Sequence, residues 1–343
     1  MYTFASALGI AVLAMFPLLL QKFGARRMLL GVTTILGLSA LGLSLFTTPF
    51  FTAIVFLFFL CCSVPIYSLL DIFIEEKLDG SEGVTGRVRG LYLVIVNIAF
   101  TLGPLIAGLV ITYYSFGQLY ALAAFLAFVF FVLGLSVTRG FKDPRYPHIT
   151  LPYLVRTVLK DKVAVRIMSI NFLLQMRYAI VVIYLAIYLH EVLGFSIAQS
   201  GLMITLGNMP FVLLQYPLGW IGDKWLGERK LIVLGFVLTC SGGFMIGLFP
   251  TTSLLVMTSI LLLTFTGAAI IEVMSESYFF KHIKARNDAH IMAFRMLIPL
   301  SYMIAPVFAA IVMFFLPVNY IFAAVATLCL LGIPLSLSLK DTH

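Results

Sequence analysis

Eleven apolar segments, each long enough to cross a lipid bilayer as a helix, follow one another along this chain of 343 residues. About 20 helical residues cross the hydrocarbon core of a membrane. Membrane-spanning strands are shorter and alternate apolar with polar residues, which these segments do not. The chain is 62% hydrophobic and 10% charged, so we expect an all-α, polytopic membrane protein. The segments lie at about 1–20, 28–46, 50–72, 90–112, 118–138, 166–189, 197–220, 231–249, 253–275, 290–314 and 318–338.

Lys and Arg gather in every second connection between these segments. The first, third, fifth, seventh and ninth connections carry basic residues, and the connections between them carry none. The positive-inside rule places the basic connections in the cytoplasm. We therefore expect a multi-pass protein of the cell (inner or plasma) membrane, with its amino terminus outside and its carboxyl terminus cytoplasmic. This orientation accounts for the formal net charge of +8, so nucleic-acid binding is not needed to explain it.

The chain also contains an internal repeat. Residues 17–27 match residues 219–230, where Leu226 is inserted, and residues 103–108 match residues 305–310. Both matches have an offset of 202 residues. Two matches at one offset predict two parallel, pseudo-symmetric helical bundles.

The predicted bundles differ by one helix. Projected back by the offset, the first helix of the second bundle has no counterpart, so we expect the chain to lack the first helix of a twelve-helix ancestor. We place a five-helix bundle at 1–138, a cytoplasmic linker at 139–165 and a six-helix bundle at 166–343.

The linker contains a predicted amphipathic helix. Its apolar residues share one helical face, and its basic residues lie elsewhere. A helix of this kind lies along a membrane surface. The apolar set is Leu151, Leu154, Val155, Val158 and Leu159, and the basic set is Arg156, Lys160 and Lys162.

The stretch from Gly219 to Lys230 resembles the signature of the major facilitator superfamily. That signature has a glycine, three residues, an aspartate, a basic residue, a spacer, a second glycine and further basic residues. The copy at 17–27 is degraded, with Pro17 for the glycine and Gln21 for the aspartate. The resemblance implies the fold of that superfamily, and transport of a small solute by a secondary active transporter with alternating access.

These signature residues suggest a cytoplasmic latch. Small residues let two helices approach, the aspartate can bond to amides at the next helix start, and the basic residues can reach carboxylates on a neighbouring helix. The alternative is that they are ordinary interfacial charges. The candidates are Gly219, Asp223, Lys224, Gly227, Arg229 and Lys230, with Gln21, Gly24, Arg26 and Arg27 in the first bundle, and the carboxylates Asp71, Glu272 and Glu276.

The segment with Gly103, Pro104 and Gly108 resembles the fifth-helix glycine–proline motif of exporters in the superfamily, although Ala99 replaces its first glycine. The resemblance favours efflux. The segment at 50–72 lacks the arginine usual in proton-coupled exporters, which argues against proton antiport. The identity of a coupling ion, H⁺ or Na⁺, is left open.

Polar residues inside the segments are candidates for a solute cavity, because ionisable groups in a membrane are costly. Arg177 shares a helical face with Tyr184 and Tyr188, and Asn171, Gln175 and Tyr178 share another. In the superfamily this helix lines the central cavity, where a guanidinium can bind an anionic or hydrogen-bonding solute. The alternative is a structural arginine. Weaker candidates, which also suit interhelical hydrogen bonding, are Asn97, Asn208 and Gln215.

Other classes of protein fit less well. No pattern of catalytic residues, metal ligands or cofactor binding is recognisable, so we expect no enzyme. The expected partners are the bilayer and a small-molecule substrate, with the chain acting as a monomer. The alternative function is that of a truncated, transport-inactive membrane protein with a regulatory or scaffolding role.

Overall fold

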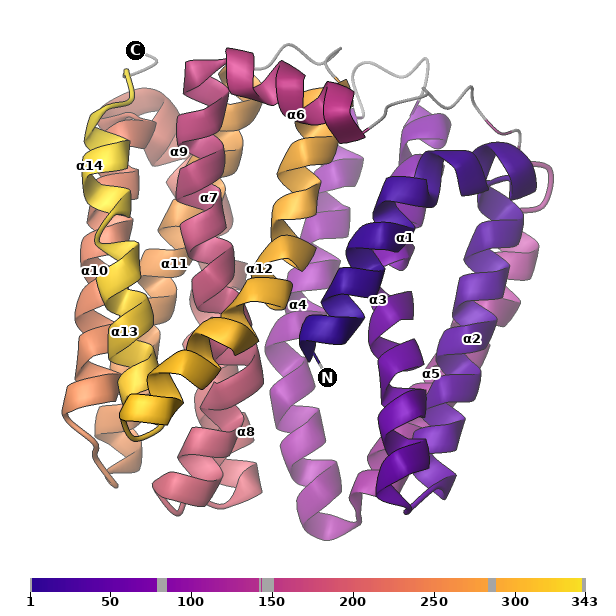
Figure 1. Ribbon diagram of the computed structural model, residues 1–343, viewed down its shortest axis with the longest axis horizontal. Coiled ribbons are helices and arrows are strands. Elements are labelled where there is room, and N and C mark those ends of the chain that lie inside the picture. Colours follow the sequence, from indigo (N-terminus) through magenta and orange to yellow (C-terminus); the bar gives the residue numbers. More distant parts are fainter. Residues whose placement is uncertain (1, 79–84, 142, 144–150, 283–287, 341–343) are drawn as a thin grey trace. The chain divides into compact units, whose positions relative to one another are not determined.

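The computed structural model describes residues 2–78, 85–141, 143, 151–282 and 288–340. Within these ranges the chain forms helices and no strand, which confirms the all-α prediction (Figure 1). Three π-helical segments, Val181–Leu185, Tyr188–Val192 and Gly222–Leu226, extend the helices Lys162–Ile180 and Gln215–Ile221. The helices are α1 (Tyr2–Phe23), α2 (Ala25–Leu45), α3 (Pro49–Leu78), α4 (Thr85–Tyr113), α5 (Phe116–Val137), α6 (Leu151–Lys160), α7 (Lys162–Ile180), α8 (Ile197–Leu213), α9 (Gln215–Ile221), α10 (Glu228–Leu248), α11 (Leu254–His282), α12 (Asp288–Phe315), α13 (Tyr320–Cys329) and α14 (Gly332–Leu337).

Helices account for most of each predicted apolar segment, and the last segment, 318–338, is divided between α13 and α14. In the described ranges, nine helices are long and apolar enough to cross a membrane, or ten when the bent pair α8 and α9 counts as one span. The segment at 1–20 is helical as α1, and its membrane crossing stays a prediction. The segment at 197–220 bends by 42° between α8 and α9, where Pro217 has no N–H to donate to the carbonyl of Leu213.

The helices form two compact units. Unit 1 comprises Met1–Val94 and Val110–Leu151, and unit 2 comprises Ile95–Leu109 and Pro152–His343. The bundle boundaries at 138 and 166 stay predictions.

Unit 1 is held together around α2 and α3. Helix α2 packs against α3 and α5, and α1 packs against α3. Burial of apolar side chains in this unit joins residues from three helices. The buried cluster is Phe16, Leu20, Ala25, Leu29 and Leu69.

In unit 2, α10 and α11 pack closely against each other. A side-chain carbon added to Gly235 would lie 2.7 Å from Cγ1 of Ile271, and one added to Gly267 would lie 2.6 Å from the amide nitrogen of Thr239. Thr239 Oγ1 donates to the carbonyl of Thr264 (3.3 Å), and Thr264 Oγ1 donates to the carbonyl of Thr239 (3.0 Å). Small residues and side-chain hydrogen bonds are the usual means of joining helices in a membrane.

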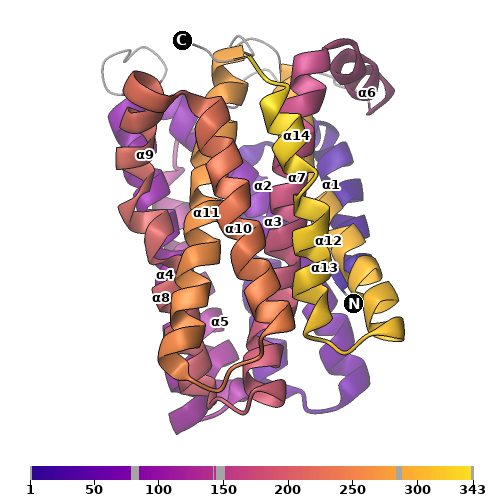
Figure 2. The same cartoon turned by 90° about the vertical axis from the view of Figure 1, so that its left-hand side faces the viewer.

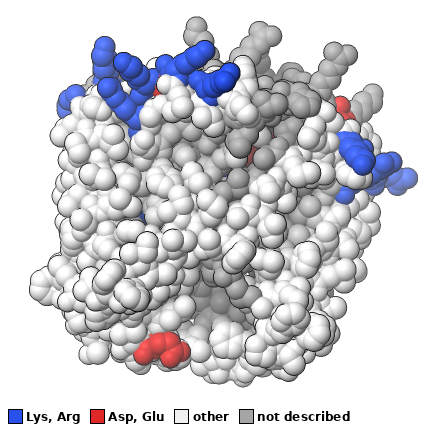
Figure 3. Space-filling model, in the orientation of Figure 1, with Lys and Arg blue, Asp and Glu red and all other residues white. Residues whose placement is uncertain are grey.

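The outer surface of unit 2 is apolar. Large apolar side chains such as Val182, Leu255 and Phe314 are exposed. Figure 3 shows a broad uncharged surface on this face of the molecule, with Lys and Arg side chains gathered beyond it towards the end where α6 lies. An uncharged band with charges beyond it suits a protein that lies in lipid.

Candidate functional site

Arg177 of α7 is buried inside unit 2, with 4% of its surface exposed. Its Cζ lies 4.5 Å from the ring centre of Phe265 and 5.5 Å from that of Tyr178. Such contacts stabilise a desolvated cation. Among the described residues, Nη2 of Arg177 has no hydrogen-bond partner. Arg177 borders a cavity of about 10 Å³, a size close to the ~10–15 Å³ that one water molecule needs.

Two of the other predicted polar residues of α7 face α11. The hydroxyl of Tyr178 donates to Oε2 of Glu272 (3.3 Å), and Nδ2 of Asn171 donates to Oγ of Ser275 (3.4 Å). Tyr178 and Glu272 are partly exposed, whereas Asn171 and Gln175 are buried. The structure thus brings a predicted cavity residue, Tyr178, together with a predicted latch residue, Glu272.

Tyr188 lies on the same interior side as Arg177. It is fully buried, its hydroxyl donates to the carbonyl of Ile246 (3.2 Å), and its ring lies 5.2 Å from that of Phe322. Ile246 and Phe322 also line the cavity beside Arg177. Tyr184 is partly exposed and is not among the residues that line this cavity.

The weaker candidates are dispersed. Asn97 lies on α4, Asn208 on α8 and Gln215 on α9, and all three are partly exposed. They do not line the cavity beside Arg177.

The second copy of the signature forms the turn into α10. Gly227 has φ 74° and ψ 153°, a backbone conformation that favours glycine. The next residue, Glu228, is fully buried, pairs with Nζ of Lys281 and accepts a hydrogen bond from Oγ of Ser277 (3.3 Å). Lys281 and Ser277 belong to α11, so this carboxylate ties the start of α10 to α11.

The other predicted latch residues of this copy lie around that turn. Nζ of Lys224 lies 5.6 Å from the ring centre of Trp220, Lys230 is exposed and Arg229 is partly exposed. Close helix approach occurs at Gly222, where an added carbon would lie 2.7 Å from Sδ of Met274, whereas Gly219 faces open space. The side chain of Asp223 lies outside the described residues.

The first copy has the same turn. Gly24 has φ 78° and ψ 153° and precedes α2 as Gly227 precedes α10. Here Oδ1 of Asp143 accepts the amide proton of Ala25 (2.6 Å), and a side chain on Gly24 would collide with that carboxylate. Asp143 lies after α5 and supplies the helix-start carboxylate that Gln21 cannot.

The remaining predicted latch residues are Arg26, Gln21, Arg27 and Asp71 of unit 1 and Glu276 of unit 2. Arg26 donates from Nε to Oγ1 of Thr138 (3.3 Å) and from Nη2 to the carbonyl of Leu135 (3.4 Å). Gln21 and Arg27 are exposed, and Asp71 and Glu276 are partly exposed.

The glycine–proline segment of α4 packs against α8 within unit 2. A carbon added to Gly108 would lie 3.0 Å from the carbonyl oxygen of Ile197 and 3.4 Å from Cα of Gly201. A carbon added to Gly201 would collide with the carbonyl of Pro104, whereas Gly103 faces open space. The motif therefore permits close helix packing at Gly108.

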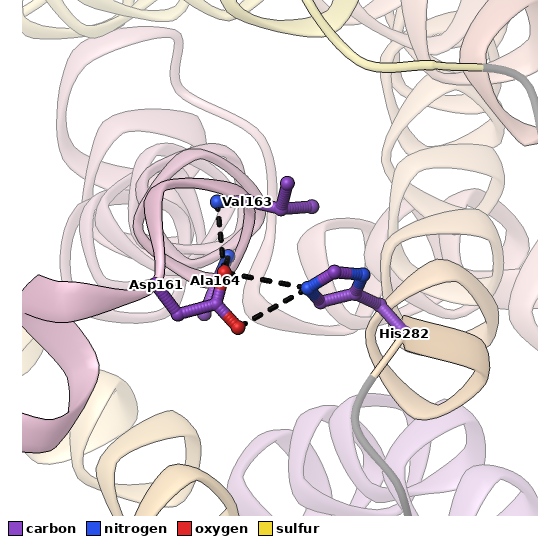
Figure 4. Close-up of polar contacts among 4 residues, drawn as sticks. All are labelled: Asp161, Val163, Ala164 and His282. Atoms are coloured by element: carbon purple, nitrogen blue, oxygen red, sulfur yellow. Dashed lines mark hydrogen bonds and ion pairs between the residues drawn. The ribbon is translucent and has the colours of Figure 1, made fainter.

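The start of α7 is tied to the end of α11 (Figure 4). Oδ1 of Asp161 accepts the amide protons of Val163 and Ala164, both at 3.0 Å, and Oδ2 lies 3.1 Å from Nε2 of His282. Partial burial raises the pKa of the Asp161 carboxyl. The hydrogen bonds from Ala164, His282 and Val163, together with the charge of His282, outweigh this effect and hold the pKa below its ordinary value.

A family model described as Major Facilitator Superfamily matches residues 1–298 and, in a second match, residues 167–342. The chain belongs to the major facilitator superfamily. A solved structure, "Crystal structure of nucleoside transporter NupG", shares its fold, with a TM-score of 0.74, 14% identity, and coverage of 99% of this chain and 89% of that chain. No curated protein matches the chain by sequence at the threshold applied.

Membership of the major facilitator superfamily makes this chain a membrane transporter of small molecules and not an enzyme. Several residues that tie helix ends together lay outside the predicted set: Glu228, Lys281, Asp143, Asp161 and His282. Glu228 had a signal, an acid directly after the turn glycine where the signature expects a base. Asp143 had none, because its contact with Ala25 joins positions 118 residues apart.

Proposed function

We propose that this chain is a secondary active transporter that moves a small solute by alternating access between its two helical bundles, as a monomer and in the direction of efflux. The shared backbone conformation of Gly24 and Gly227 supports two equivalent bundles. The glycine–proline segment around Gly108 supports efflux, because it resembles a segment of exporters.

The observation that carries the proposal is the pairing of Tyr178 with Glu272. Ionisable groups inside a membrane are costly and mark pathways for solutes or protons. Glu272 lies ten residues from the end of α11, or about 15 Å at a helical rise of 1.5 Å per residue. Its carboxylate accepts the hydroxyl proton of Tyr178, and both side chains are partly exposed.

We assign proton coupling to this pair. An ionised Glu272 accepts from Tyr178, whereas a protonated Glu272 can donate, so one proton changes the hydrogen bonds that the pair offers to a solute. Cζ of Arg177 lies 5.5 Å from the ring centre of Tyr178, and its positive charge interacts with the carboxylate of Glu272. Direct contact of Arg177 with the solute stays a prediction.

The Glu228–Lys281 and Asp143–Ala25 contacts each lie within one unit. They tie helix ends together, which suits bundles that move as rigid bodies in alternating access. A latch made by the other predicted basic residues stays a prediction.

The test is transport by the full chain in liposomes, with imposed H⁺ or Na⁺ gradients. The solute panel includes sugars, peptides, drugs, organic anions and nucleosides, the last because the structural neighbour is a nucleoside transporter. We expect gradient-driven transport of one class, and we expect Glu272→Gln to abolish the response to the pH gradient while exchange of the solute persists. Glu191→Gln, at an exposed position, is the matched control.

Two outcomes contradict the proposal. A pH response that survives in Glu272→Gln removes proton coupling at this pair. A folded chain that transports no member of the panel favours the regulatory or scaffolding role instead.

A further inference from the structure

Helix α6 is positioned at the membrane surface by its neighbour. It ends at Lys160, and α7 begins at Lys162. Since α7 opens a candidate membrane span, the end of α6 lies at the boundary of the bilayer. Figures 1 and 2 show α6 running across the end of α7 instead of continuing along it.

The protein covers only one side of the apolar face of α6. Leu154 is 6% exposed, whereas Val155 is 45% exposed and Leu159 is 66% exposed. On a helix, Val155 and Leu159 are neighbours one turn apart. An apolar strip of this kind at a bilayer boundary is buried at low cost by lipid.

Basic side chains border this strip. Arg156 and Lys160 are exposed, lie one turn apart and directly follow Val155 and Leu159 in sequence. Helix α6 contains no acidic residue. Long basic side chains beside a lipid-buried strip can extend to the headgroups, where anionic lipids complement their charge.

The end of α6 is also held in place by contacts with α7 and α11. Asp161, the one residue between α6 and α7, caps α7 and bonds to His282 at the end of α11 (Figure 4). This contact between Asp161 and His282 holds Lys160 at the level where α7 and α11 leave the membrane.

We propose that α6 is a surface anchor that inserts Val155 and Leu159 into the adjacent lipid leaflet and binds anionic lipid headgroups through Arg156 and Lys160. A basic residue near an anionic surface contributes about a five-fold preference for it. Loss of both charges should therefore lower the ratio of docked to undocked α6 by about 25-fold.

The experiment uses the full chain in vesicles of neutral phosphatidylcholine or of phosphatidylcholine mixed with anionic phosphatidylglycerol. A nitroxide label at Val155→Cys reports the apolar strip, and a label at Thr157→Cys, more than a third of a turn away on the polar side, is the matched control. Unsubstituted protein treated with the same label corrects for the four native cysteines. Collision with lipid-soluble oxygen is compared with collision with a water-soluble nickel chelate.

We expect the Val155→Cys label to collide mainly with oxygen in the anionic vesicles and the Thr157→Cys label mainly with nickel. Replacing Arg156 and Lys160 by Gln should lower the ratio of docked to undocked α6 about 25-fold, which moves the Val155→Cys label towards water. Added inorganic phosphate should not move this label. A Val155→Cys label that meets nickel in both vesicles, or that meets neither reagent because protein covers it, would overturn the proposal. So would an unchanged response in the double Gln variant.

Discussion

The burial of the Glu228 carboxylate predicts that removing either partner of its ion pair with Lys281 destabilises the protein to a different extent. The side chain of Glu228 is 1% exposed, whereas that of Lys281 is 40% exposed. Removing the ammonium leaves a carboxylate enclosed by protein. Removing the carboxylate leaves an ammonium that water can reach. We therefore expect Lys281→Met to destabilise the protein more than Glu228→Gln does.

The size of each effect follows from this burial. Breaking a buried ion pair by removing one partner costs about 3–5 kcal/mol, which we assign to Lys281→Met. Glu228→Gln keeps an acceptor for Ser277 and loses a charged hydrogen bond, at a cost of about 1.5–3 kcal/mol. For a unit of this size, 1 kcal/mol shifts Tm by roughly 2–4 °C. The expected losses are about 6–20 °C for Lys281→Met and about 3–12 °C for Glu228→Gln.

The assay is thermal unfolding of the purified protein in one detergent. The parent, the two single variants and the double variant together form a double-mutant cycle. We expect Glu228→Gln/Lys281→Met to unfold close to Glu228→Gln alone, because the double variant removes both charges of this pair. Lys230→Met, which removes an exposed base, is the control and should change Tm little. If Lys281→Met costs no more than Glu228→Gln, or if the double variant shows additive losses, the reasoning from burial is refuted.

Three further predictions test other contacts. Because the pKa of Asp161 is lowered, its stabilising contribution is present above the ordinary aspartate pKa of about 3.9. That contribution is lost as pH falls through the lower folded pKa. Asp161→Asn keeps a helix cap, so the Tm of this variant should fall less than that of the parent protein between about pH 5 and pH 2. Asp143→Ala should lower the free energy of unfolding by about 0.5–2 kcal/mol, the contribution of one helix cap, and so lower Tm. Gly24→Ala should lower it more, because it adds strain at φ 78° and a collision with Asp143. Equal losses in the two variants would argue against the collision. Gly267→Ala should separate α10 from α11 and destabilise the protein by about 1–3 kcal/mol, whereas Gly31→Ala, where an added carbon meets open space, should leave Tm unchanged or raise it.

The sequence by itself determined the helices and the class of protein. Apolar segments of about 20 residues need only local backbone hydrogen bonds and a lipid solvent to become helices, so their positions can be found without knowing their neighbours. The turn glycines Gly24 and Gly227 were visible for the same reason, since the repeat at 202 residues preserves a local backbone conformation.

Tertiary structure alone decided which polar groups meet. Tyr178 and Glu272 are 94 residues apart in sequence, Glu228 and Lys281 are 53 apart, and Ala25 and Asp143 are 118 apart. Helical periodicity placed Tyr178 and Asn171 on one face but could not name α11 as the helix that they contact. The surroundings of Arg177 were likewise decided by packing, because the aromatic ring of Phe265 and the cavity beside it belong to helices far along the chain. Local sequence fixes where a side chain points on its helix, and only the packing of helices fixes what it meets.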